Sequence, residues 1–328
     1  MTEKIRLGML RLSDAAPIVA ADRHGIFRQH GLDVEIIVEP SWANIADKLG
    51  YGLLEGAVML PPLAIACALG LRGRKTDLVV PMSLSANGNA LTLARKWQGD
   101  LAAGGIKTLA TRQKLRLAVV HAYSTHDLLL RYWLAANGVD PDTDIEIKPL
   151  SPSEMVSSLA AGAIDGFCAG APWSHVAAKA GLGFTALKTG DIWHGHPEKC
   201  LTLRADFAAR DPALLRQLLI ALREACTYCA MPAHRPVLAA LLARPEYLDL
   251  PQELIETSLD PAEGGPVFTA TYPSPDHAAW FATQMLRWGK VQQDALTVAR
   301  DLYRPELYLA AGGRKLDEVQ DVFCDTRG

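Results

Sequence analysis

The sequence has little excess charge of either sign. Its 33 lysines and arginines stand against 36 aspartates and glutamates, for a net charge of −3 at pH 7. No basic run interleaved with aromatic residues appears, so the chain has no general affinity for nucleic acids, and any anion site must be local. Hydrophobic residues make up 49% and charged residues 21% of the 328 residues, which suffices for two domains with substantial cores.

The chain also lacks a long uninterrupted apolar segment. Residues 1–16, MTEKIRLGMLRLSDAA, contain no stretch as long as a secretion signal or a membrane-spanning helix requires. The segment from Ile5 to Leu10 already has the pattern of a first strand. We therefore expect a cytoplasmic protein that is neither exported nor embedded in a membrane, although a signal removed beforehand would leave the same sequence.

Paired cysteines and familiar catalytic motifs are missing as well. Most of the six cysteines have apolar neighbours, which is typical of reduced thiols. Cys226 and Cys229 form a CxxC within an amphipathic helical pattern and have no second pair, which favours two helix thiols over zinc or redox chemistry. Cys168 is more typical of a small buried hydrophobe than of a nucleophile. With no GxSxG, Walker or GxGxxG motif, the sequence favours a binding protein without a cofactor over an enzyme.

A strand, a polar turn and a helix follow one another in the middle of the chain. Residues 115–120 form a short apolar run of buried-strand length, and residues 127–137 carry apolar side chains at helical spacing. Ser124 or Thr125 can cap the first turn of this helix. Its free backbone N–H groups then make a ready anion site with His126 at the mouth. On this local pattern alone, a half-buried histidine beside a cap is the more common arrangement.

Strand and helix patterns alternate up to about residue 205 and become mostly helical from Pro212. Residues 83–90 and 189–199 are expected to be polar turns. The expected strands are 5–11, 32–38, 57–60, 78–82, 91–94, 115–120, 145–148, 164–168, 184–187 and 200–203.

One sequence pattern occurs twice. Five positions recur at a constant offset of 110 residues, and each copy has a helix, a glycine turn, a buried strand, a proline and a second helix. Such a repeat predicts two related α/β lobes with mainly parallel sheets and ligands at the strands' carboxyl ends. We place lobe I at 1–112 plus 206–328 and lobe II at 113–205. The matched residues are Leu49, Gly52, Glu55-Gly56 and Pro62, and Leu159, Gly162, Asp165-Gly166 and Pro172.

Several polar residues are candidates for the cleft between these lobes. Lys199 ends a polar turn and enters an apolar strand, so its ammonium is either held at the cleft or exposed on the surface. Trp42 opens a helix and is either a core aromatic or an indole N–H donor. Asn87 and Asn89 offer amide donors if they are not simply solvated. Neutral donors, one cation and a helix N-terminus suit a small, weakly hydrated monoanion.

His194, His196 and Glu198 form an HxHxE string that invites a metal interpretation. The string lies in a Gly/Pro turn with no companion HxxxH or carboxylate cluster. We therefore favour a solvated polar loop and no metal site.

Taken together, five segments resemble the nitrate- and bicarbonate-binding proteins of ABC transporters. The resemblance runs from about Ile5 to Arg204 and more loosely to the end. It implies an α/β, two-lobe periplasmic-binding-protein-like fold of type II, a hinged flytrap with the anion in the cleft. The segments are PSWANIADKL, NGNALTLA, YSTHDLLLRYWLAANGVDPD, AIDGFCAGAPW and TGDIWHGHPEKCL.

The resemblance also implies which residues contact the anion. Transporter binders commonly carry glutamine where Asn89 stands, so the shorter amide changes that contact. Lys199 should make the strongest contact through a charge-assisted bond. If protonation of His126 adds attraction, affinity should rise as the pH falls toward the free histidine pKa of about 6.5. The implied nitrate ligands are Trp42, Gly88, Asn89, Thr125, His126 and Lys199.

Transporter members usually carry a leader and a linker, and this sequence shows neither. That combination resembles the NasS-type nitrate/nitrite sensors, which pair with a NasT-like RNA-binding antiterminator. We therefore expect a cytoplasmic sensor that controls such a partner in nitrate assimilation, without binding nucleic acid itself. The alternatives are a transporter binding protein whose leader is missing, and an enzyme such as a pyrimidine-precursor synthase, whose Cys- and His-rich site is not found. Bicarbonate with a cation such as Ca²⁺ is the rival ligand, and Glu198 keeps it open.

Overall fold

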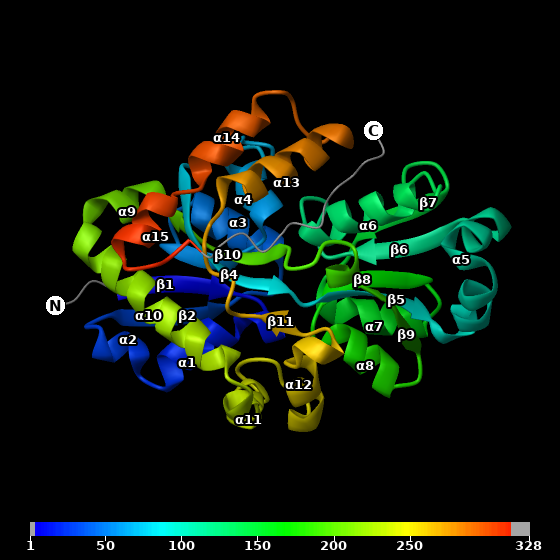
Figure 1. Cartoon of the computed structure of the whole chain (residues 1–328), viewed down its shortest axis with the longest axis horizontal. Coiled ribbons are helices and arrows are strands. Elements are labelled where there is room, and N and C mark those ends of the chain that lie inside the picture. Colours follow the sequence, from blue (N-terminus) through cyan, green and yellow to red (C-terminus); the bar gives the residue numbers. More distant parts are fainter. Residues whose placement is uncertain (1–3, 316–328) are drawn as a thin grey trace.

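The structure is a computed structural model that describes residues 4–315. Two α/β lobes lie side by side, each built around its own sheet (Figure 1). This is the two-lobe architecture expected from the sequence. Among the described residues, no helix combines the length and the apolar character that a membrane crossing requires.

The first sheet has six strands in the order β11-β4-β10-β3-β1-β2. β1 is parallel to β2 and β3, whereas β10 is antiparallel to both β3 and β4. The sheet is therefore mixed, where a mainly parallel one was expected. Its strands are β1 (Lys4–Met9), β2 (Asp33–Val38), β3 (Gly56–Met59), β4 (Leu78–Asn87), β10 (Pro197–Arg204) and β11 (Pro266–Val267).

The second sheet has five strands in the order β7-β6-β8-β5-β9 and repeats this mixed arrangement. β6 is parallel to β7 and β8, and β5 is antiparallel to β8 and β9. Its strands are β5 (Asn89–Ala94), β6 (Leu115–Val119), β7 (Ile145–Pro149), β8 (Gly166–Gly170) and β9 (Gly183–Lys188).

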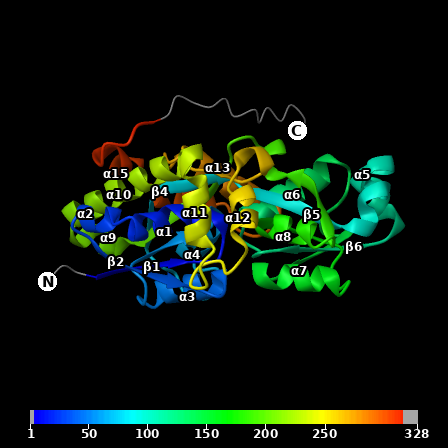
Figure 2. The same ribbon diagram turned by 90° about the horizontal axis from the view of Figure 1, so that it is seen from below.

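Helices cover both sheets, and three clusters of buried apolar side chains fill the space between the layers. In Figure 2, α3 and α7 lie along the same side of the two lobes. The helices of the first lobe are α1 (Ala16–Arg23), α2 (Ile26–Gln29), α3 (Trp42–Gly50), α4 (Pro61–Ala68), α9 (Ala205–Arg210), α10 (Pro212–Ala230), α11 (Arg235–Leu242), α12 (Gln252–Ser258), α13 (Pro275–Arg287), α14 (Ala295–Leu302) and α15 (Pro305–Ala310). Those of the second are α5 (Gln98–Arg112), α6 (Thr125–Ala136), α7 (Pro152–Ala160) and α8 (Trp173–Lys179).

The chain crosses between the lobes earlier than expected. Residues 83–87 continue β4 and are not part of a polar turn, because their short side chains fit a buried strand. Gly88, with φ of 87°, ends that strand, and β5 then pairs in the other sheet. β10 returns to the first sheet at Pro197, which pairs with Ala86 of β4. By strand pairing, lobe II therefore covers residues 89–196, where 113–205 was expected, because hydrophobic pattern alone does not reveal in which sheet a strand pairs.

The 110-residue sequence repeat has a structural counterpart. The backbone N–H and guanidinium of Arg6 donate to Glu55, and the guanidinium also reaches the Gly52 carbonyl. In the second lobe, Arg116 donates in the same way to Asp165 and to the Gly162 carbonyl. One arginine–carboxylate pair in each lobe thus links a strand to the loop before its parallel neighbour. It links β1 to the loop before β3 in the first lobe and β6 to the loop before β8 in the second.

The repeat extends to the two crossover strands. In β10, Leu203 pairs with Gly56, and in β5, Leu93 pairs with Gly166. Four residues earlier on each strand, Lys199 and Asn89 occupy corresponding positions, 110 residues apart. Both strands begin at the boundary between the lobes, so this symmetry brings the lysine and the asparagine to the same region.

We predict that Asp165→Ala destabilises the protein by about 1–3 kcal/mol, the cost of unpairing a buried charge-assisted bond. Burial acts to raise the pKa of Asp165, but the bonds from Arg116 outweigh it and lower the pKa. The stabilisation is therefore present above the unfolded pKa of about 3.9 and is lost as the pH falls through the folded value. Urea unfolding at pH 7 measures the loss. Asp301→Ala on the exposed face of α14 is the control, expected within about 0.5 kcal/mol of wild type; equal losses would refute the role of the pair.

Candidate functional site

A lysine buried between the lobes holds two carboxylates. The ammonium of Lys199 lies 2.8 Å from Asp14 Oδ2 and 2.7 Å from Glu198 Oε1. Lys199 and Glu198 come from the start of β10, and Asp14 from the 3-10 turn between β1 and α1 (Ser13–Ala15). All three side chains are at most 4% exposed. Lys199 is thus buried as a cation between two groups of opposite charge.

Glu198 extends the cluster into the second lobe. Its Oε2 accepts a hydrogen bond of 2.6 Å from the amide of Asn89. The Nε2 of His126 lies 3.6 Å from Oε1, and the Nδ1 of His196 lies 3.8 Å from Oε2. The carboxyl therefore accepts one hydrogen bond from β5 and lies near two imidazoles, one on α6 and one just before β10.

Two helices begin near this region. Ser124 caps α6, its hydroxyl accepting the N–H of Asp127 at 3.1 Å, so Thr125 and His126 occupy the first turn. Trp42 likewise opens α3, and its ring centroid lies 5.5 Å from the Lys199 ammonium. The partial positive charge of these N-termini favours an anion.

Several buried polar atoms near the lysine have no hydrogen-bond partner in the protein. They are Trp42 Nε1, Thr125 Oγ1, Asn89 Oδ1 and both ring nitrogens of His126. Because buried polar atoms are almost always paired, so many unpaired atoms in one region indicate a site for a polar ligand. Most of these atoms can donate, which suits a ligand made of acceptors.

For both Glu198 and Lys199, burial and the neighbouring charges shift the pKa in opposite directions. Burial raises the pKa of Glu198 to about 7, and the Lys199 ammonium only partly opposes it. Burial alone would lower the pKa of Lys199, but the carboxylates of Asp14 and Glu198 outweigh it and raise that pKa. Lys199 thus stays charged at neutral pH, whereas Glu198 titrates there.

The two histidines stay neutral. Burial, and then the nearby Lys199 charge, put the pKa of His126 well below 6.5. Burial lowers the pKa of His196 to about 3. The expected gain in affinity from protonating His126 near pH 6.5 is therefore wrong for this environment, and His126 serves as a neutral donor.

The structure brings most of the expected ligands together. Trp42, Asn89, His126 and Lys199 lie around Glu198, and Thr125 precedes His126 on α6. Gly88 contributes a backbone turn, and its carbonyl accepts the N–H of Ala171 at 2.8 Å.

Other residues of the cluster were missed or misplaced by sequence reasoning. His196 and Glu198 are fully buried, so the expected solvated loop is wrong for two of the three HxHxE residues, and only His194 is exposed. Among residues 4–315, no three His, Cys, Asp or Glu side chains are arranged to hold a metal ion. Asp14 was not considered, although it lies 110 residues before the cap Ser124 and its place could have been found from the repeat.

Contacts between the lobes enclose the cluster. The ammonium of Lys290, after α13, lies 3.0 Å from Asp127 and donates to the Ala122 carbonyl at 2.9 Å. The rings of Trp193 and Trp280 approach to 4.5 Å between centroids. Both contacts join the first lobe to the second.

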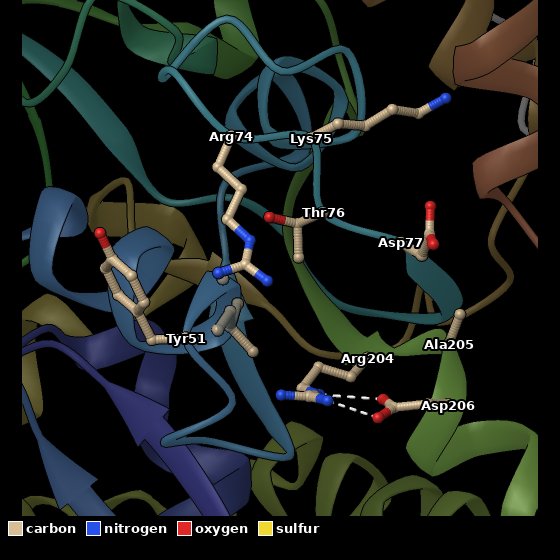
Figure 3. A pocket seen from close by; sticks show the side chains of 10 residues that line it. Tyr51, Arg74, Lys75, Thr76, Asp77, Arg204, Ala205 and Asp206 are labelled. Carbon is tan, nitrogen blue, oxygen red and sulfur yellow. Dashed lines mark hydrogen bonds and ion pairs between the residues drawn. The ribbon is translucent and has the colours of Figure 1, made fainter.

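A surface pocket at the other end of β10 differs in character from this cluster (Figure 3). It is lined by Tyr51, Arg74, Lys75, Arg204 and Asp206, among others. Arg204 is already paired with Asp206, and Arg74 lies over the Tyr51 ring. The buried cluster, with its unpaired donors, is the better candidate for the functional site.

Comparison with known proteins identifies the family. The model of the NMT1-like family matches residues 1–243. The chain belongs to the NMT1-like family. This NMT1-like protein is 32% identical to the nitrate/nitrite binding protein NrtA of Synechococcus elongatus, over 99% of the chain and 81% of that protein. It is also 39% identical to the nitrate import ATP-binding protein NrtC of Synechocystis, over 93% of the chain and 50% of that protein.

The chain thus spans about half the length of NrtC and of the bicarbonate transport ATP-binding proteins CmpC that it also matches. Among solved structures, it superposes on the periplasmic nitrate-binding protein NrtA of Synechocystis with a TM-score of 0.89 at 28% identity, covering 95% of this chain and 88% of the other. The alkanesulfonate-binding protein SsuA of Xanthomonas axonopodis shares the fold at a TM-score of 0.74 and 17% identity, with 93% and 99% covered.

We predict that Lys199→Met strongly destabilises the NMT1-like protein. Two buried carboxylates lose their cation, which costs about 3–5 kcal/mol. The ammonium acts to lower the pKa of Glu198, so without it that pKa rises further. Protonation of Glu198 then restores stability, and the deficit shrinks as the pH falls from 8 to 6. Urea unfolding at both values measures it.

Lys148→Met in β7 is the matched control, since Lys148 meets Glu146 at 3.7 Å on the surface and its loss should cost less than about 1 kcal/mol. If Lys199→Met unfolds no more easily than this control at pH 8, the ion triad does not stabilise the site.

Proposed function

We propose that this protein binds nitrate or nitrite in the buried cluster between its lobes. The observation that carries the proposal is the set of unpaired buried donors around the Lys199 ammonium. Nitrate is planar, with one charge spread over its oxygens, so N–H groups around its edge can hold it. The names of the NrtA relatives agree with this ligand.

Each residue has a distinct part in this proposal. Lys199 supplies the charge-assisted bond, the strongest single contact. Trp42 and neutral His126 each donate one N–H, and Thr125 donates a hydroxyl at the N-terminus of α6. Because the donors come from both lobes, the bound anion stabilises the closed arrangement over an open one.

We predict that Trp42→Phe weakens nitrate binding while the fold is kept. The ring remains, but the indole N–H is lost, at a cost of about 1.5–3 kcal/mol, or roughly 10- to 150-fold in Kd. Isothermal titration with nitrate measures this change.

Trp97→Phe is the matched control, since the Trp97 indole nitrogen also lacks a hydrogen-bond partner. Trp97 follows β5, and the Lys96 ammonium lies over its ring. Equal affinities for both variants would remove Trp42 from the site. In the same titrations, tighter binding of bicarbonate with Ca²⁺ than of nitrate would replace the proposed ligand.

We further propose that the chain is a cytoplasmic sensor that passes the state of its cleft to a NasT-like antiterminator in nitrate assimilation. Closure moves surfaces such as the one around Lys290 and Asp127, which join the lobes. A partner that recognises the open arrangement is then released by the anion. Linkage requires the partner to weaken anion binding by the same factor, and a tenfold effect corresponds to about 1.4 kcal/mol.

The second candidate is the substrate-binding component of a nitrate or bicarbonate ABC transporter. It is favoured by the matches to NrtA, NrtC and CmpC, which are named as transport or binding proteins. The cleft would work identically, but the closed form would be delivered to membrane subunits.

We predict that the protein forms a complex with a NasT-like antiterminator that nitrate or nitrite dissolves. Size-exclusion chromatography of the mixture, with and without the anion, measures this. A complex that persists at saturating anion, or that never forms, would contradict the sensor and favour the transporter candidate. Chloride at the same concentration controls for ionic strength.

A further inference from the structure

The buried cluster carries more negative than positive charge when Lys199 and its two carboxylates are ionised and the histidines are neutral. Lys199 contributes +1, whereas Asp14 and Glu198 contribute −1 each, for a sum of −1. An incoming monoanion would raise this to −2 in a region whose side chains are almost fully buried. Because buried charge without compensation is costly, the anion would be repelled unless one negative charge is removed.

One group of the cluster, Glu198, can remove that charge near neutral pH. Lys199 stays charged, since its pKa is raised, and His126 and His196 stay neutral, since theirs are lowered. The Cys168 thiol on β8 also stays neutral, because burial raises its pKa. Burial gives Glu198 a pKa of about 7.

Two other carboxylates lie near Glu198. Asp14, from the turn before α1, is in direct contact with the Lys199 ammonium. Asp127, on α6, lies within 3.1 Å of both Arg131 and Lys290, so its charge is compensated outside the cluster.

The contacts of Glu198 show what a proton on Oε1 would change. Its Oε2 accepts from the Asn89 amide at 2.6 Å, a bond that the neutral carboxyl can keep. Its Oε1 receives the Lys199 ammonium at 2.7 Å and lies 3.6 Å from His126 Nε2. Once protonated, Oε1–H becomes a donor, and the Lys199 N–H that it had accepted becomes available to an acceptor.

We propose that the anion enters this site together with one proton from solvent, and that Glu198 holds that proton as a neutral carboxyl that donates to the anion. The inference rests on the proposed binding of nitrate by this cluster. The site then binds one monoanion and one H⁺ together. Starting from ionised Glu198, its total charge is therefore the same before and after binding. Affinity is consequently tied to pH although neither nitrate nor the histidines titrate near neutrality.

The test is isothermal titration with nitrate at pH 6, 7 and 8. The wild type should bind about tenfold more weakly at pH 8 than at pH 6, because Glu198 must be protonated against a pKa of about 7. At pH 8, titration in two buffers of different ionisation enthalpy should give an uptake of about 0.9 proton per nitrate. An uptake of zero with equal affinity at all three values would overturn the inference.

Two variants locate the proton. Glu198→Gln mimics the neutral carboxyl, so it should bind at pH 8 as tightly as the wild type does at pH 6, with no proton uptake. Asp165→Asn is the control, because Asp165 is a buried carboxylate paired with Arg116 in the second lobe, and it should keep the wild-type pH dependence. Proton uptake that persists in Glu198→Gln would assign the proton to another group and contradict the proposal.

The outcomes also separate this inference from the proposed function. Nitrate that fails to bind the wild type at any pH would refute the proposed ligand. Nitrate that binds without proton uptake would leave that ligand in place and refute the proton coupling alone.

Discussion

An ammonium group placed between two carboxylates in the buried region between the lobes is the interaction on which the rest of the site depends. Asp14 and Glu198 stabilise the charge of the fully buried Lys199, and its ammonium gives both buried carboxylates an opposite charge. This mutual stabilisation fixes the start of β10, the turn before α1 and, through Asn89, the start of β5. The donors that lack protein partners are held around this triad.

The placement of the triad follows from the repeated architecture. In each lobe, one strand follows a segment of the other lobe and pairs antiparallel with a strand of the parallel set. β10 pairs with β3 in the first lobe, and β5 pairs with β8 in the second. Lys199 and Asn89 hold equivalent positions on these strands, so the two halves supply a cation and an amide at the same boundary. A site built on strands that link the lobes senses their relative position, which is what a closing cleft requires.

Local patterns predicted much of this arrangement. The cap at Ser124, the helix that follows it and the 110-residue repeat could be read from the sequence, because each depends on neighbouring residues or on a fixed offset. The two-lobe fold followed from the repeat and from the family resemblance. The serines and the asparagine of segment 83–87 are typical of loops and predict a turn, whereas the structure buries residues 83–86 within β4. Asp14 and the burial of His196 and Glu198 depend on contacts between distant segments, which no local pattern reveals.

The central claim is that the cluster around Lys199 is an anion site. A crystal structure of the protein grown with nitrate tests it most directly. The account predicts planar density between the lobes, within hydrogen-bond distance of Lys199 Nζ and Trp42 Nε1, with the lobes in contact through Lys290 and Asp127. Nitrate bound only elsewhere, such as in the surface pocket beside Arg74, with the cluster unchanged at saturating anion, would contradict it.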